Sequence, residues 1–141
     1  MSTLGTAGAK AGRAQGTIEV KSWEPQPYEA EAQGPTLNEI QVTETFKGDI
    51  QGEGRVRFLQ AQRGDGSASF VGIERVTGAL AGREGSFLLQ DEGTLVGDRV
   101  EGRWFVISGS ATGGLAGLRG EGTFSARLGE HAHWVLEYRF E

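Results

Sequence analysis

The sequence contains no cysteine among its 141 residues, which excludes disulfide bonds and thiolate metal sites. No run of apolar residues approaches the ~18 that a membrane-spanning helix needs. The opening stretch, MSTLGTAGAKAGRAQ, lacks an apolar core of signal-peptide length. We therefore expect a cytoplasmic protein that makes no contact with a membrane.

Positive charge is also scarce. Lys and Arg number 14 against 19 Asp and Glu, so the formal net charge is -5. Binding to DNA or RNA requires a basic surface, so we expect no nucleic-acid partner. The three prolines all fall in WEPQPYEAEAQGP, residues 23–35, which we interpret as a long, extended surface connection.

Glycine, in contrast, is abundant, with 24 residues spread along the chain. Spacing of this kind favours tight turns and barrel corners. The helical period of 3.6 residues is never sustained, whereas alternation with period two recurs. The last strand is the clearest, because Trp134, Leu136, Tyr138 and Phe140 fall on one face. The expected strands cover residues 16–21, 38–46, 52–62, 67–80, 86–90, 102–107, 122–128 and 133–140.

Eight strands in short succession predict an all-β fold, an eight-stranded antiparallel β-barrel wide enough for one small ligand. A β-sandwich is the alternative. Residues 1–14 are small and polar and are expected to be a disordered segment, with a single barrel domain over 15–141. Because RWFVI and SFLLQ are apolar on both faces, one face needs cover, from the proline segment or from another subunit. We therefore also expect a homo-oligomer.

The glycine-rich stretch GSATGGLAGLRGEG, residues 109–122, invites comparison with phosphate-binding loops. A Walker loop ends in Gly-Lys-Ser/Thr and opens a helix, and a dinucleotide fingerprint also precedes a helix. This stretch has no lysine, and a strand follows it. We interpret it as a shaped corner of the barrel, anchored in the core by Leu115 and Leu118.

Three polar residues fall in step with apolar ones: Glu44 with Ile40 and Val42, Gln60 with Val56 and Phe58, and Glu74 with Phe70 and Val76. A carboxyl on an apolar face is costly unless it is paired, hydrogen-bonded or protonated. These residues lie either at a barrel mouth, or behind a bend at Gly72 that reverses the register, or in a ligand pocket. In the last case Glu74 is our candidate catalytic acid or base.

The candidate pocket residues share the predicted inner face of the barrel. They are Glu44, Phe58, Gln60, Phe70, Trp104, Trp134 and Tyr138. His131 and His133 have the spacing of metal ligands on a strand, but they share the outer face and lack further ligands, so we expect exposed histidines and no metal. Serines occur in VISGS and GSAS, but not in the nucleophile-elbow pattern.

The stretches TIEVKSWEPQPY, FKGDIQGEG, VGIERVTGALAGREGSFLLQ and SGSATGGLAGLRGEGTF occur in that order. In this order the chain, from about Thr17 to its end, resembles the bacterial domain of unknown function 3224 family. That family is similar to the allene oxide cyclase barrel, a fold shared with plant dirigent proteins. The resemblance implies an eight-stranded antiparallel barrel, and the Glu74 context GxERVTG matches. In the family pattern a histidine often stands at the position of Asp91, and an acidic residue at that of Gly114.

Relatives of this fold cyclise or orient reactive hydrophobic molecules inside the barrel, so the resemblance implies such a role here, although fold alone does not fix function. The first hypothesis is a cyclase or isomerase without a cofactor, in which one carboxyl assists. The second is a binding or carrier protein for a small hydrophobic molecule. A third is a structural protein whose barrel is filled by side chains.

Overall fold

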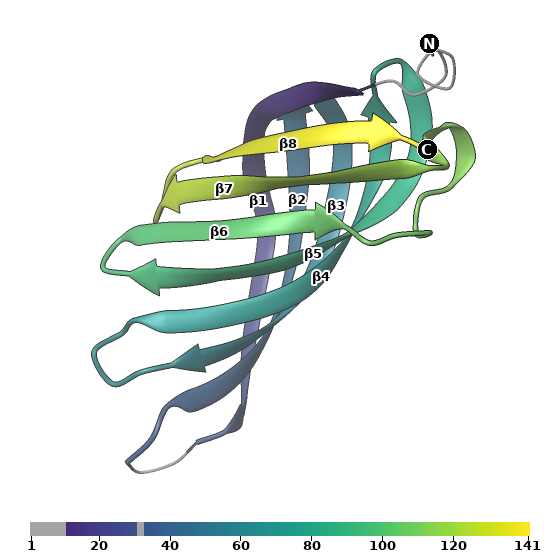
Figure 1. Cartoon of the computed structure of the whole chain (residues 1–141). Coiled ribbons are helices and arrows are strands. Elements are labelled where there is room, and N and C mark those ends of the chain that lie inside the picture. The colour runs from purple at the N-terminus through teal and green to yellow at the C-terminus, as the bar shows by residue number, and fades with distance from the viewer. Residues whose placement is uncertain (1–10, 31–32) are drawn as a thin grey trace.

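The computed structural model describes residues 11–30 and 33–141, and most of them belong to eight strands (Figure 1). The strands are β1 (Ala11–Glu29), β2 (Thr36–Gly48), β3 (Ile50–Gln62), β4 (Ala68–Leu80), β5 (Arg83–Val96), β6 (Arg99–Val106), β7 (Leu118–Arg127) and β8 (Ala132–Phe140). One 3-10 turn, η1 (Gly113–Leu115), lies between β6 and β7. Within the described ranges no helix is long and apolar enough to cross a membrane.

Each strand pairs with the next in antiparallel register, and β1 also pairs with β8, so the sheet closes into a barrel. This confirms the predicted eight-stranded antiparallel barrel and excludes the sandwich. The closure is incomplete along β1. Its first part, Ala11–Ile18, pairs with β8. The rest of the strand pairs with β2 alone, and its register with β2 shifts after Val20.

Alternation along the strands separates an inner from an outer face, as a period of two requires. Even-numbered residues of β2 point inward, which buries Ile40, Val42 and Phe46, while Gln41 between them is exposed. The same rule makes Trp104 and Val106 inner residues of β6 and leaves Phe105 on the outside.

Many glycines occupy the inner face in the middle of strands, where we had expected turns and corners. A side chain at Gly72 would overlap the ring of Phe58, and one at Gly102 would overlap the ring of Phe124. The missing side chains therefore make room for large aromatic rings inside a narrow barrel. This use of glycine explains how an eight-stranded barrel with so many inward aromatic residues can close.

Two expected boundaries require correction. The proline segment is not a connection, because Trp23–Glu29 continues β1 and pairs with β2, and Pro25 and Pro27 lie beside Ile40 and Asn38. Proline is tolerated there because this part of β1 has a neighbour on one side only. The segment expected to be disordered extended to residue 14, but Ala11–Ala14 pairs with β8 and Ala14 is buried. Residues 1–10 lie outside the described ranges.

One half of the barrel is solidly packed; we call it the closed half. Its core takes buried residues from all eight strands. They include Phe46, Leu80, Phe87, Trp134 and Phe140. Apolar burial on this scale provides the main stabilisation of the fold.

The glycine-rich stretch closes this end. Leu115 and Leu118 are buried in the core, which confirms their predicted role as anchors. The stretch runs along the free start of β5, where the Thr112 amide donates to the Ser86 carbonyl at 2.8 Å and the Leu88 amide donates to the Ser110 hydroxyl at 3.1 Å. The stretch thus takes the place of β6 beside the start of β5, because β6 ends at Val106, opposite Leu89.

Candidate functional site

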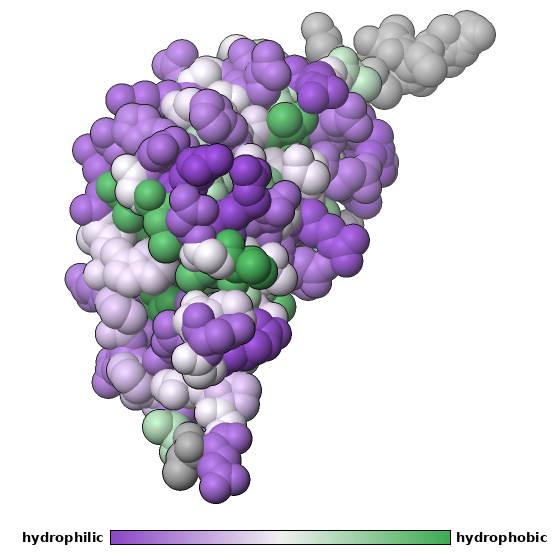
Figure 2. All heavy atoms as spheres, turned by 90° about the vertical axis from the view of Figure 1, so that its left-hand side faces the viewer, coloured by the Kyte–Doolittle hydropathy of each residue, from purple (hydrophilic) through white to green (hydrophobic). Residues whose placement is uncertain are grey.

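The other half of the barrel, which we call the open half, contains a cavity of about 780 Å³. The mouth of the cavity lies at the end that carries the β5–β6 and β7–β8 turns, where Leu95, Val100 and Leu128 line it. Figure 2 views the molecule from this end, where hydrophobic side chains gather in the middle of the face and hydrophilic ones surround them. A volume of this order accommodates a small organic molecule.

The wall of the cavity is mainly apolar and aromatic. Phe58, Phe70, Phe124 and Trp104 line it from four strands and form a continuous series of ring contacts, which we call the aromatic wall. The ring centroids of Phe58 and Phe70 are 5.2 Å apart, and those of Trp104 and Phe124 are 5.1 Å apart. Phe70 and Phe124 complete the series at 6.3 Å.

Three carboxyl groups form the floor of the cavity, where the open half meets the closed half. Glu44 of β2, Glu74 of β4 and Asp91 of β5 all line the cavity and are only 8%, 1% and 3% exposed. We call them the acidic floor. No lysine or arginine joins them from the strands that the structure describes. Among the described residues, Arg127 is the one basic residue that lines the cavity, and it lies at the mouth with its guanidinium 3.5 Å from the Asp98 carboxylate.

A glycine in β3 allows the floor to assemble. Gly54 lies beside Glu44 in the register and separates β2 from β4 at this level. A side chain at Gly54 would overlap the Glu74 carboxylate, so Oε2 of Glu74 occupies the space that the glycine leaves. Glu74 can therefore reach across β3 and form a hydrogen bond with Glu44.

The environment makes the acidic floor resist ionisation. Burial raises the pKa of Glu74 well above its ordinary value, and the charges of Glu44 and Asp91 raise it further. Burial, followed by the charge of Glu44, raises the pKa of Asp91 to about 8. Burial also raises the pKa of Glu44, although the hydrogen bond with Glu74 opposes this. Within the pair, Glu74 therefore resists ionisation more strongly, and Glu44 is the member that ionises more easily.

The hydrogen-bonding capacity of the floor is not exhausted by the protein. Oε2 of Glu74 and Oδ1 of Asp91 are buried and have no hydrogen-bond partner. Nearer the mouth, in contrast, the Asn38 side-chain amide donates to Oε1 of Gln60 at 2.8 Å. Unpartnered buried polar atoms are rare in folded proteins and call for an explanation, such as a role in binding a ligand. Across the described ranges, no group of His, Asp or Glu residues is arranged to hold a metal ion.

Most of the residues predicted to form a pocket lie together in this cavity. Glu44, Phe58, Gln60, Phe70 and Trp104 all line it, as does Glu74. Glu74 is buried at the floor rather than at a barrel mouth, and no reversal of register at Gly72 turns it outward.

Two predicted pocket residues are elsewhere. Trp134 is packed in the closed half, where its indole N–H donates to the Thr17 carbonyl at 3.0 Å. Tyr138 lies against Gly12 in the same half and does not line the cavity. Both have inward parity, but parity gives the face of a strand and not the depth along the barrel.

Asp91 was missed as a member of the site. The run DEG after SFLLQ was interpreted as the end of a strand, but β5 continues to Val96. Asp91 falls in step with Phe87 and Leu89, which are buried. This parity was the available signal. Gly114, the other position that departs from the family pattern, lies in η1 against Glu84, in the closed half. His131 and His133 are exposed, as predicted.

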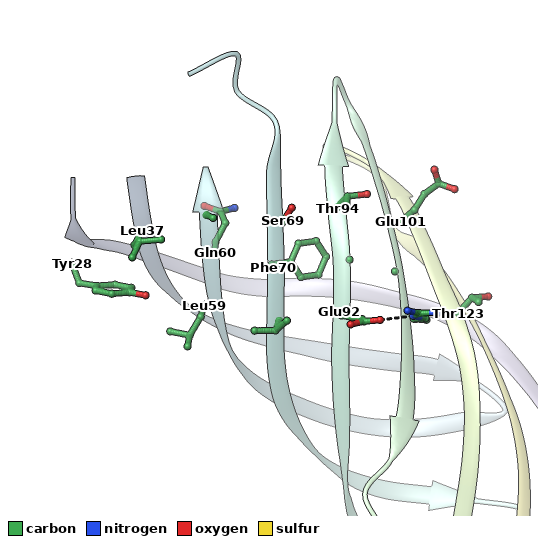
Figure 3. A pocket seen from close by; sticks show the side chains of 15 residues that line it. Tyr28, Leu37, Leu59, Gln60, Ser69, Phe70, Glu92, Thr94, Glu101 and Thr123 are labelled. Carbon is green, nitrogen blue, oxygen red and sulfur yellow. Dashed lines mark hydrogen bonds and ion pairs between the residues drawn. The ribbon is translucent and has the colours of Figure 1, made fainter. Parts of the chain in front are cut away.

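A second hollow lies on the outer face of the barrel, from β1 across to β7 (Figure 3). Leu37 of β2, Leu59 of β3 and Glu92 of β5 contribute to it. The ion pair drawn there joins Glu92 to Arg103. Both charged groups are exposed and satisfied by each other and by solvent. We therefore place the candidate site inside the barrel, where buried polar atoms lack partners.

Comparison with known proteins gives a matching family and similar solved structures. Residues 14–138 match the family described as "Protein of unknown function (DUF3224)". The fold is similar to the crystal structure of a protein of unknown function from the DUF3224 family of Shewanella oneidensis MR-1, with 30% sequence identity and a TM-score of 0.78. The similarity covers 94% of this chain and 99% of that chain. No curated protein matches the chain.

Proposed function

The chain belongs to the DUF3224 family, and we propose that it is a cofactor-independent isomerase or cyclase for a small hydrophobic molecule held in the open half of the barrel. The observation that carries the proposal is the acidic floor, in which Glu74 and Asp91 have buried, unpartnered oxygens at the base of an aromatic cavity. The resemblance to the allene oxide cyclase and dirigent barrels is in line with this substrate class.

The floor supplies both partners of a proton transfer. Glu74 resists ionisation more strongly and is the general acid, while Glu44 ionises more easily and is the general base. Glu74 gives its proton to one atom of the substrate, and Glu44 takes a proton from another. The substrate leaves with the same atoms in a new arrangement, and the pair returns to its starting state when the proton passes between the two carboxyls.

The aromatic wall holds the substrate against the floor and keeps bulk water away from it. Exclusion of water strengthens the interaction of the substrate with the carboxyls, because the effective dielectric constant is low. A flat or flexible apolar molecule suits the wall formed by Phe58, Phe70, Phe124 and Trp104.

The test is incubation of the protein with a small-molecule extract of its producing organism in heavy water. We expect one compound to be converted into an isomer that has gained deuterium. Glu74→Gln should abolish the conversion, whereas Glu53→Gln, which alters an exposed carboxyl of β3, should not. Equal conversion by the wild type and Glu74→Gln, with Glu44→Gln also active, would contradict the proposed acid and base.

A second candidate is a carrier that binds a small hydrophobic molecule without turnover. The apolar wall favours it, because a carrier needs an apolar cavity and no catalytic group. Native mass spectrometry of protein purified from its own host distinguishes the two. A molecule that copurifies and is returned unchanged from heavy water supports the carrier.

Self-association is a separate proposal. The outer faces of β3 to β6 expose Leu59, Val71, Ile73 and Phe105, and the register places Leu59 beside Val71. Exposed apolar clusters of this kind are often covered by a partner. We propose that a second copy of the chain covers them. Sedimentation at tens of micromolar should give a species larger than a monomer, and Val71→Lys combined with Phe105→Lys should restore the monomer.

A further inference from the structure

The acidic floor has a surplus of hydrogen-bond acceptors that the protein does not use. Oε2 of Glu74 and Oδ1 of Asp91 lack partners, although both residues are more than nine-tenths buried and line the cavity. A protonated carboxyl offers one donor and further acceptor sites, so protonation alone leaves acceptors unmatched. The floor therefore suits a ligand group that brings several donors.

The surroundings of the floor also lack positive charge. On the strands that face Glu74 and Asp91, the titratable neighbour is Glu44 of β2, and the inner faces of β3 and β6 contribute uncharged side chains. Arg127 and Glu130 are exposed at the mouth, and Tyr138 belongs to the closed half. An anionic ligand would thus meet three acidic groups with no basic group at the floor to balance them.

The aromatic wall stands next to these acids. The indole of Trp104 lies beside Asp91 in the register, and Phe58 and Phe70 line the same cavity from β3 and β4. Aromatic faces attract cations, and the attraction is largest in desolvated sites. Carboxyl groups and aromatic rings in one cavity form the combination that recognises an organic cation.

We propose that the molecule bound in the cavity carries a basic nitrogen, which is held as a cation between Glu74, Asp91 and the aromatic wall. This inference rests on the proposed function, and it names the substrate class. It excludes carboxylates and phosphates, and it predicts that simple alcohols and ketones of the same shape bind less well.

The proton balance follows from the states of the two partners. A free amine is already protonated in solution at neutral pH, and Asp91, whose pKa burial raises to about 8, is also protonated there before binding. When the ammonium group binds, one carboxyl ionises, its O–H electron pair stays on oxygen, and its proton leaves to the solvent. When the nitrogen instead arrives neutral, the same proton passes directly to its lone pair and no proton is released.

Because of this balance, the affinities of the amine and of a neutral analogue should depend on pH in different ways. Because one proton is released for each ammonium bound, the affinity should rise about tenfold per pH unit between pH 6 and 7. Burial raises the pKa of Asp91 to about 8, so this range lies below it. An alcohol accepts a hydrogen bond from a protonated carboxyl, so its affinity should be level to pH 7 and decline above pH 8.

The experiment is calorimetric titration of the full chain with 1-naphthylmethylamine, 1-naphthylmethanol and 1-naphthoate, at pH 6, 7 and 8.5, in two buffers of different protonation enthalpy. We expect the amine to bind at least tenfold more tightly than the alcohol at pH 7, with release of about one proton, and the naphthoate not to bind. Glu74→Gln and Asp91→Asn should each weaken the amine at least tenfold and change the alcohol little.

Variants of the wall locate the binding. Ala126 lines the cavity, so Ala126→Phe should abolish binding of both compounds, whereas Ala61→Phe, which lies on the outer face of β3, should not. If the alcohol binds as tightly as the amine, or if neither acidic-floor variant affects the amine, the basic nitrogen is refuted while the proposed function stands. If none of the three compounds binds in the cavity, the proposed function fails as well.

Discussion

The two halves of the barrel are built from the same strands and have opposite interiors. In the closed half, the inner positions carry Phe87, Trp134 and Phe140, and the loop that contains Leu115 fills the end. In the open half, the strands carry Asn38, Gln60 and the acidic floor, and the end is left open to a cavity of about 780 Å³. The packing of the closed half stabilises the fold, and this offsets the cost of a cavity and buried acids in the open half.

This division agrees with a general relation between stability and function. Burying uncompensated carboxyls lowers stability, and such groups persist where the rest of the fold supplies a surplus. The boundary between the halves runs through Glu44, Glu74 and Asp91, with Phe46 and Leu89 next to them on the closed side. The comparison predicts that equivalent changes in the two halves differ in their effects.

The largest difference is expected for two leucines. Leu115→Ala removes a fully buried side chain from the closed half and should cost about 2–5 kcal/mol. Leu95→Ala removes a half-buried side chain from the cavity mouth and should cost less than about 1 kcal/mol. Urea unfolding measures both. Equal losses would show that the open half is packed as firmly as the closed half.

The next effect concerns the glycine that admits Glu74 to the floor. Gly54→Ala places a methyl group where the Glu74 carboxylate lies, and should cost about 1–3 kcal/mol and separate Glu74 from Glu44. Gly64→Ala is the matched control, because nothing lies within 4 Å of that position. Thermal unfolding measures the loss, at roughly 2–4 °C per kcal/mol. A Gly54→Ala protein as stable as the control would contradict the geometry of the floor.

The third effect is a slope of stability against pH. The pKa of Asp91 is about 8 in the folded protein against an ordinary value of 3.8, so between these pH values the folded state binds more protons than the unfolded state. Stability should therefore decrease as pH rises through this range, by up to about 1.4 kcal/mol per unit for each such group. Asp91→Asn should reduce the slope, measured by urea unfolding at pH 5 to 8.

The control for this slope is Asp98→Asn at the exposed β5–β6 turn, which should leave it unchanged. A wild-type protein that becomes more stable as pH rises from 5 to 8, in parallel with Asp91→Asn, would contradict the burial of an uncharged Asp91.

Local pattern was enough to predict the barrel and most of the lining of the cavity, because alternation assigns each residue of a strand to a face. It placed Glu44, Gln60 and Glu74 on the inner face correctly. Alternation carries no information on depth, so Trp134 and Tyr138 could not be separated from residues that line the cavity. Asp91 was missed because Asp-Glu-Gly is typical of a turn, and here tertiary pairing overrides that preference.

The structural roles of the glycines were the hardest to predict from the sequence. In the sequence, Gly54 looks like the other glycines, and its importance depends on a side chain twenty residues away that reaches across β3. The proline segment was wrongly predicted to be a connection for a similar reason. β1 tolerates Pro25 and Pro27 only because β8 does not extend beside them. Both cases depend on pairing between distant strands, which composition and spacing do not specify.

The most direct test of the account is a pH titration of the side-chain carboxyls, followed by carbon-13 NMR of protein labelled at Asp and Glu. Asp91→Asn, Glu74→Gln and Glu44→Gln assign the three signals. We predict that Asp91 titrates near pH 8, that Glu74 titrates well above the ordinary range, and that Glu44 is also raised. If all three carboxyls instead titrate below about pH 5, as exposed groups do, the floor is solvated and charged, and the proposed division between a packed and a functional half is contradicted.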